Sequence, residues 1–192
     1  MKEELIAFLS RFPSLFPEAI DVLAEQLTVR SFTKGTLLVR EGQLCNECYF
    51  VLKGCLRQYL LLDGLEKTTA FYTEGQAAVL FSSYTRQTAS PHYLSCLEDS
   101  LLLIGTPTSE TEMYRQFPEL EYITRQMLEQ DFGKTQDALT RFITSSPEQR
   151  YLHILEERPD LLQRAPQHQL ASYIGVTPES LSRIRRRIGK AS

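Results

Sequence analysis

Hydrophobic residues follow two different periods along the chain. Within residues 2–26 they recur at helical spacing around Pro13 and Pro17, which predicts two short helices. From Val29 to about Ile104, short β-rich runs alternate with glycines at intervals of seven to twelve residues. This rhythm favours an antiparallel sandwich or barrel. Asp63-Gly64 within it predicts a hairpin turn.

Helical spacing returns near Glu119 and predicts a long helix to about Phe142. Two apolar faces run along this helix. One comprises Leu120, Ile123, Met127, Ala138 and Phe142, and the other comprises Leu128, Phe132 and Leu139. We therefore expect the helix to pack on its own barrel and also on a second subunit. The dimer interface is predicted on the first face, at Leu120, Ile123, Met127 and Ala138, with the second face as the alternative.

A new helix is predicted to start after the long one. Ser146 is suited to the N-cap, Pro147 to the first helical position, and Gln149 to the third, where it completes a capping box. We place a domain boundary here. The expected parts are a sensor domain over 1–117, a dimerisation helix over 118–145 and a DNA-binding domain over 146–192.

The stretch 167–188, QHQLASYIGVTPESLSRIRRRI, predicts two helices joined by a tight turn. Gly175 can end the first helix, since glycine tolerates the left-handed backbone found there. Thr177 and Pro178 then suit the N-cap and first position of the second helix. Apolar residues form one stripe on each helix, namely Leu170, Ala171 and Ile174 on the first and Leu181, Ile184 and Ile188 on the second.

The second helix keeps a polar, basic face that fits a DNA major groove. Glu179 and Arg183 lie one turn apart; a carboxylate can accept from cytosine N4 and a guanidinium can pair with guanine O6 and N7. We expect these two side chains to read bases. Contacts with the DNA backbone are predicted for Thr177, Ser180, Arg185, Arg186, Arg187 and Lys190. The alternative is an ordinary helical hairpin with a solvated basic face, but the agreement of apolar, glycine and capping positions favours DNA binding.

Charge is distributed unevenly, although the net charge of the 192 residues is only −3. Residues 148–192 hold eight Lys/Arg against five Asp/Glu, whereas the rest holds thirteen against nineteen. A basic C-terminal part on an acidic body suits a DNA reader joined to a sensor. Apolar runs fall short of the ~18 residues that span a bilayer, and the start lacks the layout of a signal peptide. We therefore expect no membrane association, a cytoplasmic location and reduced thiols.

The stretch Glu179, Ser182 and Arg183 resembles the Glu-x-x-Ser-Arg signature of the CRP/FNR family of bacterial transcription regulators. Glu41-Gly42, the run 49–54 and Gly75 also resemble the family's cyclic-nucleotide-binding fold. The resemblance adds Ser182 as a third base reader. It implies an α+β chain with an N-terminal antiparallel β jelly-roll, or double-stranded β-helix, a long dimerisation helix and a C-terminal all-α helix-turn-helix domain. The implied partners are a second copy, a double-stranded DNA operator with an inverted repeat, and RNA polymerase.

Family members that bind a cyclic nucleotide hold its phosphate with an Arg-Ser pair and its ribose with a Glu. Counting from Gly75, the Glu falls on Leu80 and the Arg-Ser pair on Ser90 and Pro91. A buried phosphate needs a guanidinium partner, which these residues cannot supply. Arg86 nearby is more simply an exposed loop residue. We predict no cyclic-nucleotide binding of the usual kind, and the effector is unknown.

Four cysteines are the remaining candidates for chemistry: Cys45, Cys48, Cys55 and Cys96. Their spacing is similar to that of iron–sulfur members of the family. Cys48 and Cys55, however, fall in predicted strands, where alternating side chains do not converge. We expect buried structural thiols, no metal and no cofactor. His92 is the one imidazole in the barrel region, and no catalytic set is recognisable, so an enzyme is not predicted.

These observations predict a sequence-specific, homodimeric, DNA-binding transcription regulator of the CRP/FNR type. The rival is a small-molecule-binding regulatory module that acts through protein partners, with the last 45 residues as a helical cap. DNA binding at low salt distinguishes them, because a solvated cap of low net charge should bind DNA poorly.

Overall fold

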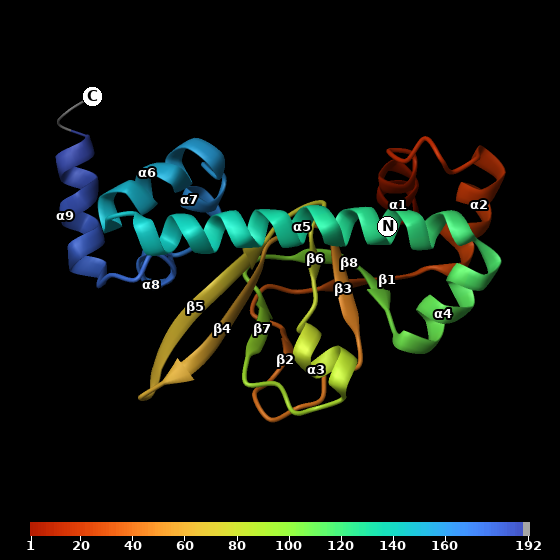
Figure 1. Ribbon diagram of the computed structural model, residues 1–192, viewed down its shortest axis with the longest axis horizontal. Coiled ribbons are helices and arrows are strands. Elements are labelled where there is room, and N and C mark those ends of the chain that lie inside the picture. Colours follow the sequence, from red (N-terminus) through yellow and green to blue (C-terminus); the bar gives the residue numbers. More distant parts are fainter. Residues whose placement is uncertain (190–192) are drawn as a thin grey trace. The chain divides into compact units, whose positions relative to one another are not determined.

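The computed structural model describes residues 1–189 and divides into two compact units (Figure 1). The first comprises Met1–Gln58 and Phe71–Glu129. The second comprises Tyr59–Ala70 and the chain from Gln130 onward. No helix within the described residues is both long enough and apolar enough to cross a membrane.

Two four-stranded sheets carry the β-rich segment (Figure 1). One has the order β1-β8-β3-β6, and the other has the order β2-β7-β4-β5. The strands are β1 (Thr28–Phe32), β2 (Leu37–Val39), β3 (Cys48–Lys53), β4 (Leu56–Leu62), β5 (Leu65–Tyr72), β6 (Ala77–Ala78), β7 (Tyr93–Cys96) and β8 (Ser100–Gly105). The strand pairs β1–β8, β3–β8, β3–β6 and β2–β7 are antiparallel. The expected antiparallel β core is therefore confirmed.

The predicted hairpin turn joins β4 and β5. Asp63 and Gly64 both have positive φ angles, 52° and 76°, which a two-residue turn of the primed type requires. Helix α3 (Phe81–Arg86) follows β6, where we predicted no helix. It ends at Gln87, which has a left-handed backbone with φ 50°.

A continuous apolar core lies between the strands of the first unit. It comprises Val39, Cys45, Tyr49, Val51, Leu56, Ala78, Leu80, Leu94, Cys96, Leu102 and Ile104, all at most 6% exposed. Alternating side chains of the strands point into this core because successive residues of a strand face opposite sides.

A second core forms where the N-terminal helices meet the first part of the long helix. The helices are α1 (Lys2–Leu9), α2 (Pro17–Gln26), α4 (Pro107–Gln116) and α5 (Pro118–Thr144). Ile123 of α5 is 6% exposed and packs in this core with Leu5, Leu9 and Leu23. Leu120 and Met127 pack against the same core.

Three of the four residues predicted at the dimer interface contact the chain's own core, Ile123 being buried and Leu120 and Met127 half-buried. Leu120, Ile123 and Met127 are used by the chain's own helices, whereas Ala138 is exposed. The alternative face is open: Leu128, Phe132 and Leu139 are 36%, 64% and 60% exposed. The sequence shows two apolar faces but does not show which of them α1 and α2 cover.

The second unit contains the end of α5, the β4–β5 hairpin from Tyr59 to Ala70, and four shorter helices. These are α6 (Pro147–Glu157), α7 (Leu161–Arg164), α8 (Gln167–Tyr173) and α9 (Pro178–Ile188). The predicted capping box at the start of α6 is confirmed, since Ser146 and Gln149 each bond the other's backbone N–H. Ser172 of α8 joins the hairpin: its hydroxyl accepts from Thr68 N at 2.9 Å and donates to Glu66 O at 3.1 Å.

Candidate nucleic-acid interface

The turn between α8 and α9 begins with a complete Schellman motif. Gly175 has φ 77°, its N–H donates to Ser172 O at 3.1 Å, and Val176 N–H donates to Ala171 O at 2.9 Å. These two bonds satisfy the last carbonyls of α8 and set the direction in which the chain leaves it.

Helix α9 starts at the predicted N-cap. Thr177 has an extended backbone, and its hydroxyl accepts from Ser180 N at 3.3 Å, with Pro178 at the first helical position. Leu181 and Ile184 of α9 are buried, as are the three stripe residues of α8, namely Leu170, Ala171 and Ile174. One side of α9 is thereby anchored and its opposite side faces outward.

The outward side carries the predicted base readers. Glu179 and Arg183 are exposed, and Arg183 Nη2 donates to Ser180 Oγ at 2.9 Å. The pKa of Glu179 is lowered by its own backbone N–H, by the Thr177 hydroxyl and by the charge of Arg183, so its carboxylate is ionised near neutral pH. Ser182 differs from these two, because its hydroxyl accepts from Gln167 Nε2 at 2.8 Å.

Five of the six predicted backbone contacts divide into three groups. Arg185 and Arg186 are exposed and available for phosphates. Thr177 and Ser180 bond one another as part of the α9 cap. Lys190 lies outside the described residues.

Arg187, the sixth predicted backbone contact, has a partner within the chain. Its guanidinium is held by Glu148 of α6, with Nε 3.1 Å from Oε1 and Nη2 2.5 Å from Oε2. A charge-assisted pair of this kind satisfies both donors. Arg187 therefore links α9 to α6 in this structure while its side chain remains 65% exposed, and its phosphate contact stays a prediction.

The cyclic-nucleotide positions hold no anion-binding group. Leu80 is part of the apolar core. Ser90 is 2% exposed, and its hydroxyl is bonded to the backbone C=O and N–H of His92. Pro91 is exposed and offers no donor. That a cyclic nucleotide is not held in the usual way stays a prediction.

The four cysteines are free thiols, each buried or half-buried. Cys45, Cys55 and Cys96 are buried, and Cys55 lies between β3 and β4 rather than within a strand. Cys48 is half-buried and donates to Glu110 Oε1 at 2.9 Å. Burial raises the pKa of Cys48 to about 12, and Glu110 adds to the rise. Within residues 1–189, His, Cys, Asp and Glu side chains form no group that could hold a metal ion.

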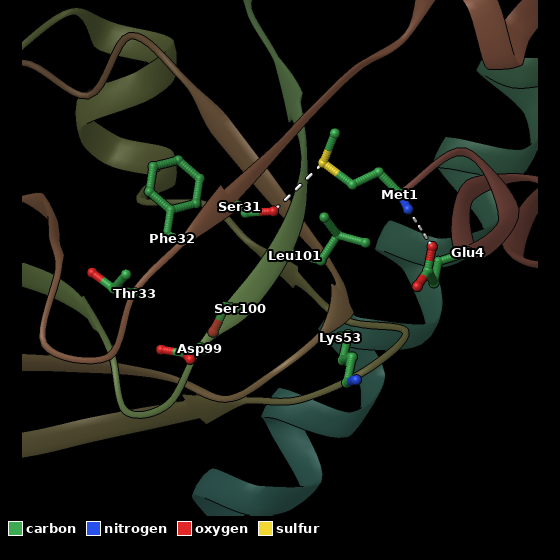
Figure 2. A pocket seen from close by; sticks show the side chains of 9 residues that line it. All are labelled: Met1, Glu4, Ser31, Phe32, Thr33, Lys53, Asp99, Ser100 and Leu101. Atoms are coloured by element: carbon green, nitrogen blue, oxygen red, sulfur yellow. Dashed lines mark hydrogen bonds and ion pairs between the residues drawn. The ribbon is translucent and has the colours of Figure 1, made fainter.

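A pocket on the first unit is lined by three charged side chains, Glu4, Lys53 and Asp99, among other residues. Figure 2 shows it beside β1 and β8, close to the N-terminus. Glu4 pairs with the N-terminal amine at 2.7 Å, and Asp99 accepts from Lys34 N at 2.8 Å. Two of its acidic groups are thus engaged by the chain itself.

Sequence reasoning missed several residues that support α9. Glu148 and Arg150 of α6 contact α9 and the end of α8, and Gln167, the first residue of α8, donates to Ser182 of α9. Glu148 was identified only as part of a helix start. Its partner, Arg187, is 39 residues away along the chain, so local spacing could not reveal the contact.

Comparison with known proteins adds evidence on the fold. Residues 29–107 match the family of cyclic nucleotide-binding domains. No curated protein matches the chain.

Solved structures match over most of the chain. FixK2 from Bradyrhizobium japonicum is 19% identical with a TM-score of 0.70, covering 86% of this chain and 85% of that one. The c-di-GMP responsive global regulator CLP of Xanthomonas campestris is 16% identical with a TM-score of 0.70, covering 90% and 91%. The Thermus thermophilus catabolite activator protein is 21% identical with a TM-score of 0.56, covering 94% and 86%. What this chain shares with these proteins is the fold, an antiparallel β core followed by helices.

Proposed function

We propose that this chain is a sequence-specific DNA-binding transcription regulator of the CRP/FNR type that acts as a homodimer. Its partners in this proposal are a second copy, a double-stranded operator with an inverted repeat, and RNA polymerase. The observation that carries it is the outward placement of Glu179 and Arg183 on a helix whose other side is buried at Leu181 and Ile184.

Their chemistry supports base reading. Glu179 and Arg183 lie at i and i+4 in the first turns of α9, the part of a recognition helix that enters the major groove. An ionised carboxylate accepts from cytosine and an arginine pairs with guanine, each discrimination being worth ~1–3 kcal/mol. Arg185 and Arg186, farther along the helix, would meet phosphates.

The homodimer is proposed on the open face of α5. Leu128, Phe132, Thr135, Leu139 and Phe142 are spaced alternately by four and three residues, the spacing of a coiled-coil seam. Apolar residues this exposed on one helix favour a partner. A second copy is the proposed partner, because two half-sites read by a two-fold pair need two recognition helices.

The effector is not assigned. Leu80 and Ser90 are committed to the core and to the backbone of His92, which supports an effector other than a cyclic nucleotide held by the usual residues. Calorimetry with cyclic AMP and cyclic GMP should give no binding heat; micromolar affinity would contradict this part of the proposal.

Selection from random double-stranded DNA tests the central claim. The full chain should enrich an inverted repeat, and a shift assay should show at least ~10³-fold preference for it over random DNA. The matched control is Glu179→Ala with Arg183→Ala, which removes both readers and keeps the exposed arginines. A wild type that enriches no sequence, or that equals the double variant, would favour the rival module without DNA binding.

A further inference from the structure

Three parts of the second unit meet at Arg150 of α6. Its guanidinium carbon lies 3.8 Å from the centroid of the Phe142 ring at the end of α5. Its Nη1 donates to Ile174 O at 3.0 Å. One side chain therefore joins the long helix, the first turn of α6, and the end of α8.

The acceptor is placed at the corner of the α8–α9 pair. Ile174 is the C-cap of α8, and helix ends leave carbonyls that need a donor. Gly175 follows with φ 77°. A Cβ at Gly175 would lie 3.2 Å from Arg150 Nη1 and 3.3 Å from Phe142 Cζ. The corner is thus packed closely against both side chains.

Arginine suits this position better than lysine. A planar guanidinium can stack on an aromatic ring while its N–H groups donate hydrogen bonds sideways, in the guanidinium plane. An ammonium offers a point charge without a stacking face. The combination fixes the corner in two directions, which a hydrogen bond by itself would not do.

Phe142 also lies at the end of the exposed seam of α5. Arg150 contacts its ring, but the residue is still 42% exposed. A second copy packed along Leu139 and Phe142 would therefore touch the same ring that carries Arg150.

We propose that Arg150 is a positioning residue that, stacked on Phe142 and bonded to Ile174 O, sets the orientation of the recognition helix relative to the dimer seam. The proposal rests on the proposed function, since it concerns how the α8–α9 pairs of two copies are held at a defined spacing. Arg150 itself touches no base in this proposal.

Half-site spacing is the readout that a merely structural role would not change. An insertion of about 5 bp, half a helical turn, puts two half-sites on opposite faces of DNA. Wild type should lose on the order of a hundredfold in affinity for this operator, because rigidly held recognition helices cannot reach both sites. Arg150→Ala should lose less than about tenfold in affinity for this operator, since recognition helices that are held less rigidly can still reach both half-sites. Arg150→Lys should show the same reduced loss of affinity as Arg150→Ala. Phe142→Leu should also show it, and should still form the dimer.

Arg141→Ala is the matched control. Arg141 of α5 forms an ion pair with Glu157 of α6, so its loss removes an arginine link between the same two helices without touching the corner. Its spacing preference should remain that of wild type. Circular dichroism and thermal unfolding establish that each variant is folded before it is compared.

A DNA-independent measurement separates this proposal from the proposed function. Spin labels at Gln136→Cys and Arg186→Cys, in chains diluted with unlabelled protein, report the distance from α5 to α9. The distribution should be narrow in wild type and with Arg141→Ala, and broad with Arg150→Ala. If wild type shows no sequence-specific DNA binding but its distance distribution is narrower than that of Arg150→Ala, the proposed function fails and the positioning role of Arg150 stands. The positioning role of Arg150 would be overturned if Arg150→Ala and wild type gave equally broad distance distributions, or if both lost the same affinity for the operator with the 5-bp insertion.

Discussion

Glu148 holds the guanidinium of Arg187 through two hydrogen bonds, from Nε to Oε1 at 3.1 Å and from Nη2 to Oε2 at 2.5 Å. The pair links the first turn of α6 to the last turn of α9 and removes one positive charge from the face proposed for DNA. Both side chains are partly exposed, 65% for Arg187 and 35% for Glu148. Its contribution to stability should therefore be at most about 1 kcal/mol.

Glu148→Gln should strengthen DNA binding for all sequences alike. The substitution releases Arg187 toward phosphates, so the slope of log affinity against log salt should steepen by about one unit. Shift assays between low and moderate salt measure it. Glu156→Gln removes the same charge from the same helix and should change the slope less; equal slopes in the two variants would show that the ion pair does not restrain Arg187.

Arg183→Ala should reduce the sequence preference while leaving weak general binding. The loss should be about 1–3 kcal/mol for the operator and small for random DNA. Competition between operator and random duplexes measures the ratio. Arg186→Ala is the comparison, because it should weaken both duplexes together; a ratio unchanged by Arg183→Ala would rule out its reading role.

Features encoded by neighbouring residues were predictable. Thr177-Pro178, Ser146-Pro147 and Asp63-Gly64 each specify a cap or turn through the conformational limits of two or three consecutive residues. The structure has all three as expected.

Features that depend on distant packing were not predictable. Both faces of α5 are apolar, and the choice of the face with Ile123 depends on the approach of Leu5 and Leu23 from the N-terminal helices. Arg150 likewise reads as one more charged residue of α6, since its partners Phe142 and Ile174 O come together only in the folded chain.

Cys48 should be almost unreactive toward thiol reagents in the folded chain near pH 8. Its pKa is raised from 9.0 to about 12, first by burial and then by Glu110, and the thiolate is the reacting form. Alkylation followed by mass spectrometry should show slow modification in buffer and rapid modification in urea. Because the unfolded thiol loses its proton at lower pH than the folded one, the free energy of unfolding should fall as the pH rises from about 9 toward 12. Glu110→Gln should lower the pKa and speed alkylation; rapid alkylation of the folded wild type would contradict the prediction.

Phe132→Glu combined with Leu139→Glu should convert the chain to a monomer and abolish operator binding. The two residues are 64% and 60% exposed, so the charges should be tolerated in a single chain. In a two-fold interface the same change would bring four carboxylates together, and burying them would be strongly unfavourable. Light scattering should report half the wild-type mass, with unchanged circular dichroism. Ile123→Glu is the contrasting variant: Ile123 is 6% exposed within the chain's own core, so it should lower the free energy of unfolding instead of the dimer affinity. A double variant that still dimerises, or a wild type that is monomeric at micromolar concentration, would place the partner surface elsewhere than on this face of α5.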